Sequence, residues 1–222
     1  MTERRTYPLD LRLIVITDAR LAAPRTVVDV VAAALAAGAP AIQLRDKTCG
    51  TRELLALADA LLPAVRAHDA LLFVNDRTDV AMMAGADGVH LGPDDLSVAA
   101  ARRIAPPNFL IGYSTDHPDA ARAAVVDGAD YIGCGVVFGT QTKADAADER
   151  IGTARLDEVA HAVAVPVVAI GGIDETNIET IGRTAAAGAA VVSAVMSAPD
   201  PGAAVRSLLD GLARGWQGAV RV

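Results

Sequence analysis

The sequence has few aromatic residues, few cysteines and no excess of basic residues, and each shortage excludes a class of protein. Only 3% of its 222 residues are aromatic, which predicts a core of Ala, Val, Leu and Ile rather than of rings. The two cysteines, Cys49 and Cys134, form no CxxC motif and no obvious pair, so we expect a reducing, cytoplasmic location. A net charge of −7 argues against partners such as nucleic acid or a membrane surface.

Long hydrophobic runs are missing as well, although 52% of the residues are hydrophobic. The longest early run, Leu13–Ile16, stops at Thr17 and Asp18, well short of a membrane span or an export signal. No HExxH motif or Cys/His cluster predicts zinc, and no Ser-His-Asp arrangement can be proposed. The sequence therefore predicts a globular protein that acts on small molecules.

Short β-rich runs alternate along the chain with Ala-rich stretches of helical periodicity. This alternation is typical of a parallel sheet, either a (β/α)₈ barrel or an open doubly wound sheet. Eight units of about 28 residues, and no GxGxxG after the first strand, favour the barrel. We expect one α/β domain, a single (β/α)₈ TIM barrel over 1–222 with a short N-terminal extension. The expected strands are Leu13–Thr17, Ala41–Leu44, Leu71–Val74, Gly88–Leu91, Leu110–Tyr113, Tyr131–Gly133, Val167–Ile170 and Ala190–Ala194.

A Gly-Ala pair recurs before every second expected strand. The four pairs begin at Gly38, Gly85, Gly128 and Gly188. Glycine can adopt the left-handed conformation that ends a helix, so each pair is interpreted as a helix-to-strand turn. A repeat of this kind supports a closed eightfold array.

In a barrel the site lies where the strands end, and the second strand ends in Gln43, Arg45 and Lys47 on one face. Two cations and an amide on one face could hold a multiply charged anion. The alternative is a surface ion pair between Arg45 and Asp46. The neighbouring strand ends carry Asn75, Asp76 and Asp95.

The two aspartates Asp76 and Asp95 suggest Mg²⁺, which prefers oxygen ligands and substrate phosphates. Helix capping is the alternative for each of them. Ser114 could either cap the next helix or bind substrate. His90 is interpreted as a satisfied residue of the barrel core, because a lone strand histidine usually is one.

The last three strand ends offer a second, neutral anion site. Gly172 and Ser193 follow the seventh and eighth strands, where barrels often bind a monophosphate through backbone N–H groups. Thr140, Thr142 and Lys143 follow the sixth strand, and Lys143 adds a cation to the mouth. A cationic, metal-assisted site beside a neutral one indicates a transferase that joins two phosphorylated small molecules and releases diphosphate.

Several segments, in this order, closely resemble the thiamine-phosphate synthase (thiamine-phosphate pyrophosphorylase) family and cover most of the chain from Leu13 to Val195. They are QLRDK at 43–47, NDR at 75–77, GADGVHLG at 85–92 with Asp95, GYST at 112–115, GADYIGCGVVFGTQTK at 128–143, AIGGI at 169–173 and VSA at 192–194. The chain departs from the family at Gly139, where the family usually has proline, and at Gln141 and the preceding Val136 and Val137.

The resemblance implies a (β/α)₈ barrel that couples 4-amino-2-methyl-5-hydroxymethylpyrimidine diphosphate to 4-methyl-5-(2-phosphoethyl)thiazole, or to its carboxylate. The products are thiamine phosphate and diphosphate, by a dissociative, Mg²⁺-assisted mechanism. Carried over by residue, the resemblance implies a pyrimidine diphosphate site of Gln43, Arg45, Lys47, Asn75, Ser114 and Lys143, with catalytic roles for Lys143, Ser114, Arg45 and Lys47. It implies Mg²⁺ ligands Asp76 and Asp95, and a thiazole phosphate site of Thr140, Thr142, Gly172, Val192 and Ser193.

Two other functions remain open on the sequence. A thiazole tautomerase resembles the synthase but tends to lack the aspartate pair and the TxTK segment, both present here. A non-catalytic barrel that binds thiamine phosphates would need no metal-activated leaving group. The sequence leaves the oligomeric state open, and a homo-oligomer is compatible with it.

Overall fold

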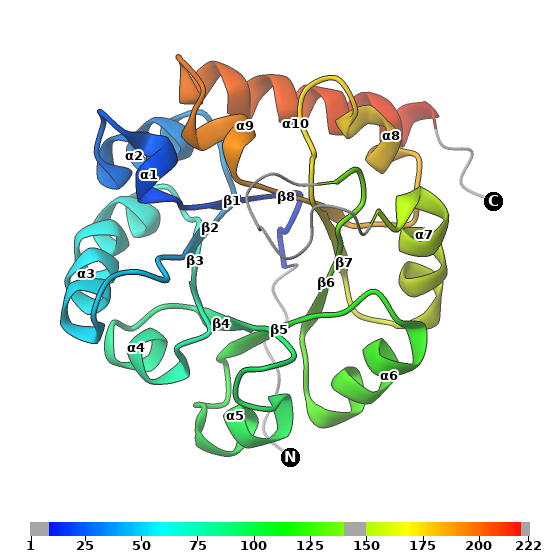
Figure 1. Ribbon diagram of the computed structural model, residues 1–222, viewed down its shortest axis with the longest axis horizontal. Coiled ribbons are helices and arrows are strands. Elements are labelled where there is room, and N and C mark those ends of the chain that lie inside the picture. The colour runs from blue at the N-terminus through cyan, green and yellow to red at the C-terminus, as the bar shows by residue number, and fades with distance from the viewer. Residues whose placement is uncertain (1–8, 140–149, 219–222) are drawn as a thin grey trace.

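The computed structural model describes residues 9–139 and 150–218, and their eight strands form a closed parallel barrel surrounded by helices (Figure 1). Each strand pairs with the next, and β8 closes the ring on β1 through Val15 and Val191. The predicted (β/α)₈ barrel is confirmed. The strands are β1 (Leu13–Ile16), β2 (Ala41–Leu44), β3 (Leu71–Asn75), β4 (Gly88–Leu91), β5 (Leu110–Ser114), β6 (Tyr131–Gly135), β7 (Val167–Ile170) and β8 (Gly188–Val191).

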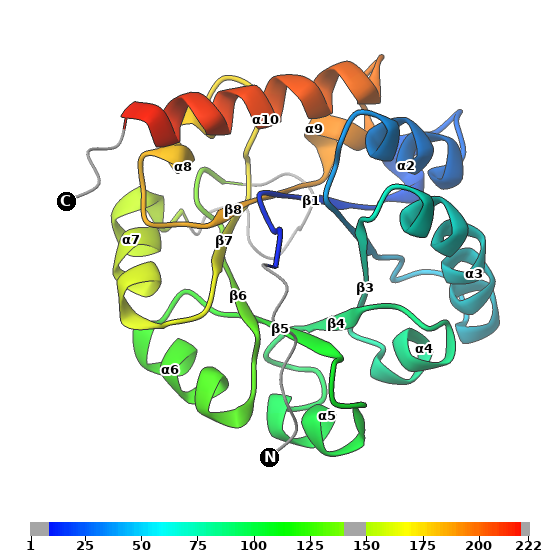
Figure 2. The ribbon, with the colours of Figure 1, turned by 180° about the vertical axis from the view of Figure 1, so that it is seen from behind.

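The helices form the outer layer, which Figure 2 shows from the opposite side. They are α1 (Ala19–Ala22), α2 (Val27–Ala36), α3 (Thr51–Ala67), α4 (Thr78–Met83), α5 (Val98–Ile104), α6 (Pro118–Asp127), α7 (Gly152–Ala162), α8 (Ile178–Gly182), α9 (Ser193–Met196) and α10 (Pro201–Gly218). Helix α10 lies across α2, α9 and α8 (Figure 1). None of the helices in the described ranges is long and apolar enough to cross a membrane.

The first seven strands lie within two residues of their predicted ends, but the prediction for the eighth is wrong. Strand β8 covers Gly188–Val191 rather than Ala190–Ala194. The backbone leaves the extended region at Val192 (φ −116°, ψ −82°), and a single-turn helix starts at Ser193. The run of small and β-branched residues suits a strand, but tertiary structure ends it early.

The Gly-Ala turns are confirmed at three of four positions. Gly38, Gly85 and Gly128 have φ of +94°, +69° and +110°, the left-handed conformation expected at the end of a helix. Gly188 differs because it already belongs to the β8 ladder, opposite Val168. A Cβ at Gly188 would collide with the carbonyl oxygen of Leu11, so glycine is required there for close packing and not for a turn.

Two separate apolar clusters make up the core, one between strands and helices and the other inside the barrel. The outer cluster is almost entirely aliphatic, as predicted, although it includes the buried ring of Phe109. The inner cluster is not, because Phe73 and Tyr131 fill its centre, fully buried, with their rings edge to face at 5.3 Å. The prediction of a core without rings is therefore wrong for the barrel interior. Glycines on neighbouring strands leave space there that an aromatic ring fills.

Candidate active site at the carboxyl ends of the strands

The end of β2 presents the predicted cationic face. Gln43 is buried and pairs in register with Ile16 and Phe73, so its side chain faces the barrel interior. Arg45 follows two residues later, and its backbone N–H donates to the hydroxyl of Thr17 at 2.8 Å. The same hydroxyl donates to the Arg45 carbonyl at 3.0 Å. Thr17, which sequence reasoning missed, thus ties the end of β1 to Arg45.

Asp46 is bonded mainly to the turn that follows it, and the charge of Arg45 makes only the smallest contribution to the lowering of its pKa. Its Oδ1 accepts hydrogen bonds from the N–H and the hydroxyl of Thr48, at 2.8 and 2.7 Å, and from the N–H of Cys49 at 3.1 Å. The carboxylate therefore shapes the turn that leads into α3. Within the described ranges, the Arg45 guanidinium forms no hydrogen bond or ion pair, so the alternative of an Arg45–Asp46 surface pair is wrong.

Asp76 and Asp95 are brought together from the loops after β3 and β4. Asp76 has a left-handed backbone (φ +64°), and its N–H donates to the carbonyl of His90 at 2.8 Å. Asp95 is oriented by the N–H of Gly92, which donates to its Oδ2 at 2.7 Å. Burial and the adjoining Asp95 carboxyl raise the pKa of Asp76, and Lys47 at 3.5 Å lowers it less than they raise it.

Neither aspartate caps a helix, so the capping alternative is wrong for both. Arg77 stands at the N-cap of α4, and Ser97 caps α5 by accepting the N–H of Ala100. The pair instead offers adjacent carboxylate oxygens whose repulsion a cation would relieve. No group of three or more His, Cys, Asp or Glu side chains gathers within 9–139 and 150–218. Two carboxylates fit Mg²⁺, which keeps several waters and completes its shell with substrate phosphates.

Asn75 and Ser114 end β3 and β5 on the interior side of the barrel. Asn75 pairs in register with His90, and Ser114 with Gly133. The Ser114 hydroxyl lies 2.8 Å from Nε2 of His90, and His117, not Ser114, occupies the N-cap of α6. Ser114 therefore belongs to the mouth of the barrel. The imidazole of His90 has hydrogen-bond partners, as predicted, but they include Ser114 at this mouth.

The loops after β6 and β7 run side by side and bring Gly172 to the mouth. Val137 and Phe138 donate their N–H groups to the carbonyls of Ile170 and Gly171, at 2.9 and 3.0 Å. Gly172 has φ +65°, and a Cβ there would collide with the Gly139 carbonyl oxygen. Gly139 itself has φ +99°, which proline cannot adopt, so the departure from the family at this position changes the backbone. The predicted residues Thr140, Thr142 and Lys143 lie outside the described residues.

Val192 and Ser193 complete the neutral side of the mouth. Val192 precedes α9, and Ser193 is the first residue of that helix. Arg25 holds α9 from its far end by donating to the carbonyls of Met196 and Ala198, at 3.1 and 2.7 Å. The N–H groups of Gly172 and Ser193 donate to no other described residue. Both are thus available to an anion.

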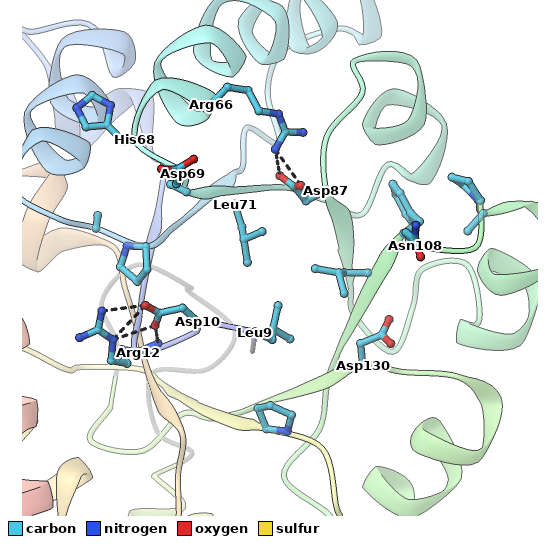
Figure 3. Close-up of a pocket in the computed structure, with 18 of the residues that line it drawn as sticks. Leu9, Asp10, Arg12, Arg66, His68, Asp69, Leu71, Asp87, Asn108 and Asp130 are labelled. Atoms are coloured by element: carbon cyan, nitrogen blue, oxygen red, sulfur yellow. Dashed lines mark hydrogen bonds and ion pairs between the residues drawn. The ribbon is translucent and has the colours of Figure 1, made fainter. Parts of the chain in front are cut away.

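A cavity of about 1010 Å³ opens at the opposite end of the barrel (Figure 3). Its lining comes from residues at or before the strand starts, including Leu71, Asp87 and Asp130. Several of its charged groups are paired with one another, as the Arg12–Asp10 and Arg66–Asp87 contacts in Figure 3 show. It contains none of the predicted site residues, and in barrels this end stabilises the fold.

Comparison with known proteins agrees with the site at the carboxyl ends. The family model for thiamine monophosphate synthase matches residues 13–195. A thiamine-phosphate synthase of Roseiflexus castenholzii is 49% identical over 196 residues, which cover 88% of this chain and 86% of that protein. One from Methanoculleus marisnigri is 47% identical over 201 residues, 90% of this chain and 95% of the other.

A solved structure of similar fold carries the family's other name, thiamine phosphate pyrophosphorylase. Thiamine phosphate pyrophosphorylase from Pyrococcus furiosus superposes with a TM-score of 0.85 at 43% identity, over 93% of this chain and 97% of that one. Sequence motifs, barrel topology and these relatives therefore agree. The chain belongs to the thiamine monophosphate synthase family, and the enzyme of thiamine biosynthesis that its motifs predicted is confirmed.

Proposed function

We propose that this enzyme joins 4-amino-2-methyl-5-hydroxymethylpyrimidine diphosphate to 4-methyl-5-(2-phosphoethyl)thiazole, or to its carboxylate, and releases diphosphate. The observation that carries this proposal is the asymmetry of the mouth. One side holds Arg45, Lys47 and the aspartate pair, which suit a diphosphate. The other side holds Gly172 and Ser193, whose N–H groups donate to none of the residues that the structure describes and suit a monophosphate.

In the proposed reaction the carbon–oxygen bond between the pyrimidine methylene and the diphosphate breaks first. Its electron pair leaves with the diphosphate, and a pyrimidine-methyl cation forms. The lone pair of the thiazole nitrogen then forms the new carbon–nitrogen bond, which gives the thiazolium of thiamine phosphate. No general base is needed, because the nitrogen carries no proton to remove. Catalysis rests on stabilising the leaving charge and on holding the two substrates in line.

The residues divide this work between them. Arg45, Lys47 and Lys143 would bind the departing diphosphate, and Gln43, Asn75 and Ser114 would orient the pyrimidine. Thr140, Thr142, Gly172, Val192 and Ser193 would bind the thiazole phosphate. Asp76 and Asp95 would hold Mg²⁺, which when bound supplies positive charge to the leaving diphosphate. Thr17 would keep Arg45 in place through both of its backbone groups.

A coupling assay tests the proposal. Purified protein is mixed with the pyrimidine diphosphate and either thiazole phosphate, with and without Mg²⁺, and thiamine phosphate is measured by mass spectrometry. We expect product only when Mg²⁺ and both substrates are present. Binding of both ligands without product would overturn the proposal in favour of a non-catalytic binding protein. Isomerisation of the thiazole without coupling would identify a tautomerase.

A further inference from the structure

A chain of polar side chains crosses the barrel interior directly beneath the proposed substrates. His90 of β4 stands in its middle, with Nδ1 2.9 Å from the hydroxyl of Tyr131 on β6 and Nε2 2.8 Å from the hydroxyl of Ser114 on β5. Gln43 of β2 lies close enough to Tyr131 to lower the pKa of its phenol. The chain therefore connects Gln43 to Ser114, two residues of the proposed pyrimidine site, through two residues that sequence reasoning assigned to no site.

Glycines on the neighbouring strands make room for this chain. A Cβ at Gly112 would collide with the ring of Tyr131, and a Cβ at Gly133 would lie 2.9 Å from Cε1 of His90. The Tyr131 ring also packs edge to face on Phe73, and its hydroxyl reaches Nδ1 of His90. The positions of both rings are thus determined by packing. Any ligand that contacts Gln43 or Ser114 meets groups that are already aligned.

The hydrogen bonds through His90 all run in one direction, because a neutral imidazole carries one N–H and its other nitrogen accepts. If Tyr131 donates its proton to Nδ1 of His90, then Nε2–H donates to Ser114, and the Ser114 proton is free for a ligand. If the direction is reversed, Ser114 donates to His90 and offers a ligand only lone pairs. Burial raises the pKa of Tyr131, which keeps its phenol protonated. Tyr131 then has its own proton to give to His90.

We propose that His90 and Tyr131 are positioning residues that orient Gln43 and set Ser114 as a hydrogen-bond donor toward the pyrimidine diphosphate. Gln43 donates to Tyr131, Tyr131 donates to His90, and His90 donates to Ser114. A diphosphate oxygen or a pyrimidine ring nitrogen accepts hydrogen bonds and donates none, so this direction suits either. The inference rests on the proposed function for the identity of the ligand, whereas the direction of the chain can be tested without it.

The direction is tested first by ¹⁵N NMR of the histidine rings in the ligand-free protein. The protein has four histidines, and the His90 signals are those lost in a His90→Leu variant. We expect a neutral ring with its proton on Nε2. A proton on Nδ1 would overturn the proposed direction whatever reaction the enzyme performs.

A double-mutant cycle then tests whether His90 acts through Ser114. Ser114→Ala and His90→Leu are each expected to weaken pyrimidine diphosphate binding about three- to tenfold, the effect of one lost hydrogen bond. In the Ser114→Ala background, His90→Leu is expected to add less than twofold, because the hydroxyl that it orients is gone. The KM for the thiazole phosphate is expected to stay constant. General damage to the barrel would change this KM as well.

Matched controls separate positioning from packing. Tyr131→Phe keeps the ring and removes only the hydroxyl, and we expect it to weaken pyrimidine diphosphate binding while thiazole phosphate KM is unchanged. His161→Asn changes a histidine on α7 whose Nδ1 bonds to the carbonyl of Asp157, and we expect no effect. Multiplicative effects of His90→Leu and Ser114→Ala would overturn the positioning role even if the wild type couples its substrates. If the wild type shows no coupling, the proposed function fails, and the NMR result alone decides the direction.

Discussion

Carboxylates lie at both ends of this barrel, but in opposite electrostatic situations. At the amino end, Asp87 accepts two hydrogen bonds from Arg66, at 2.9 and 2.8 Å, and one from the N–H of Leu72 at 2.9 Å (Figure 3). At the carboxyl end, Asp76 faces Asp95, and its pKa is raised by burial and by that neighbour. One end therefore uses its charge to hold the fold, whereas the other brings two carboxyl groups together beside Lys47, which offsets only part of their effect on the pKa of Asp76.

The same Gly-Ala-Asp sequence stabilises the amino end of the barrel at two places. Asp130 follows the turn at Gly128 as Asp87 follows the turn at Gly85. It accepts from the N–H of Ile111 at 2.8 Å and pairs with Arg102, which also donates to the carbonyl of Phe109 at 2.6 Å. Each Gly-Ala-Asp turn thus fastens the start of one strand to the preceding strand and to a helix. The aspartates of these two turns form the Arg66–Asp87 and Arg102–Asp130 ion pairs in the cavity at that end.

The largest expected effect is loss of activity when the acidic pair is broken. Asp76→Asn keeps a residue that tolerates the left-handed backbone and removes one of the two facing charges. We expect Mg²⁺-dependent coupling to fall by at least about 100-fold, a loss typical of removed electrostatic stabilisation. Because the repulsion also disappears, the free energy of unfolding at pH 7 is expected to stay equal or to rise.

Asp69→Asn is the matched control for this variant. Asp69 is the other described non-glycine residue with positive φ (+52°), and it lines the cavity at the amino end. The activities of the two variants are compared by steady-state kinetics, and their unfolding free energies by urea unfolding. Equal loss of activity in Asp69→Asn would show that the backbone at these positions, and not the charge near Asp95, matters.

The opposite result is expected at the amino end, where Asp87→Asn removes the charge opposite Arg66. The side chain of Asp87 is 3% exposed, so the variant loses a largely buried ion pair and the fold is destabilised. We expect the free energy of unfolding to drop by about 2 kcal/mol, less than for a fully buried pair because Arg66 remains half exposed to water. Below the unfolding transition, kcat is expected to be unchanged. A tenfold fall in kcat of the folded variant would contradict the division between the two ends.

A smaller effect on both properties is expected from Thr17, which belongs to the fold and to the site. Thr17→Val keeps the shape but leaves the N–H and the carbonyl of Arg45 without their partner. We expect a loss of about 1–2 kcal/mol in unfolding free energy and a several-fold higher KM for the pyrimidine diphosphate. Calorimetry measures the loss of unfolding free energy, and steady-state kinetics measures the KM. An unchanged KM would mean that Arg45 does not depend on this link.

The smallest effect is the pH dependence of stability without Mg²⁺. The pKa of Asp76 is raised in the folded protein. The contribution of Asp76 to the unfolding free energy is therefore fully present below its pKa in the unfolded chain, about 3.9, and is lost as the pH rises through its pKa in the folded protein. The unfolding free energy of the wild type, minus that of Asp76→Asn, should therefore fall across this window. At pH 7, adding Mg²⁺ should raise the melting temperature of the wild type and leave that of the variant unchanged. A difference independent of pH would mean that the pair is not coupled.

Much of this architecture could be predicted from local sequence. Strands β2, β4 and β7 have the predicted ends, because each apolar run is bounded by residues that favour turns. Gln43, Arg45, Asp76 and Asp95 could be found because barrel strands end at one mouth and these residues directly follow strands. The error at β8 has a physical reason. Val192 and Ser193 suit a strand by composition, and composition does not reveal that the backbone leaves the extended region at Val192, so that Ser193 begins α9.

Local sequence is enough to predict the alternation of strands and helices, the turns at Gly38, Gly85 and Gly128, and the end of the barrel at which the predicted site residues lie. These depend on periodicity and on backbone conformations available to single residues. Only the tertiary structure decided that Asp76 faces Asp95, that Asp87 pairs with Arg66, and that His90 links Ser114 to Tyr131. Each of these contacts joins different strands or loops, and the distance between them depends on the closure of the barrel.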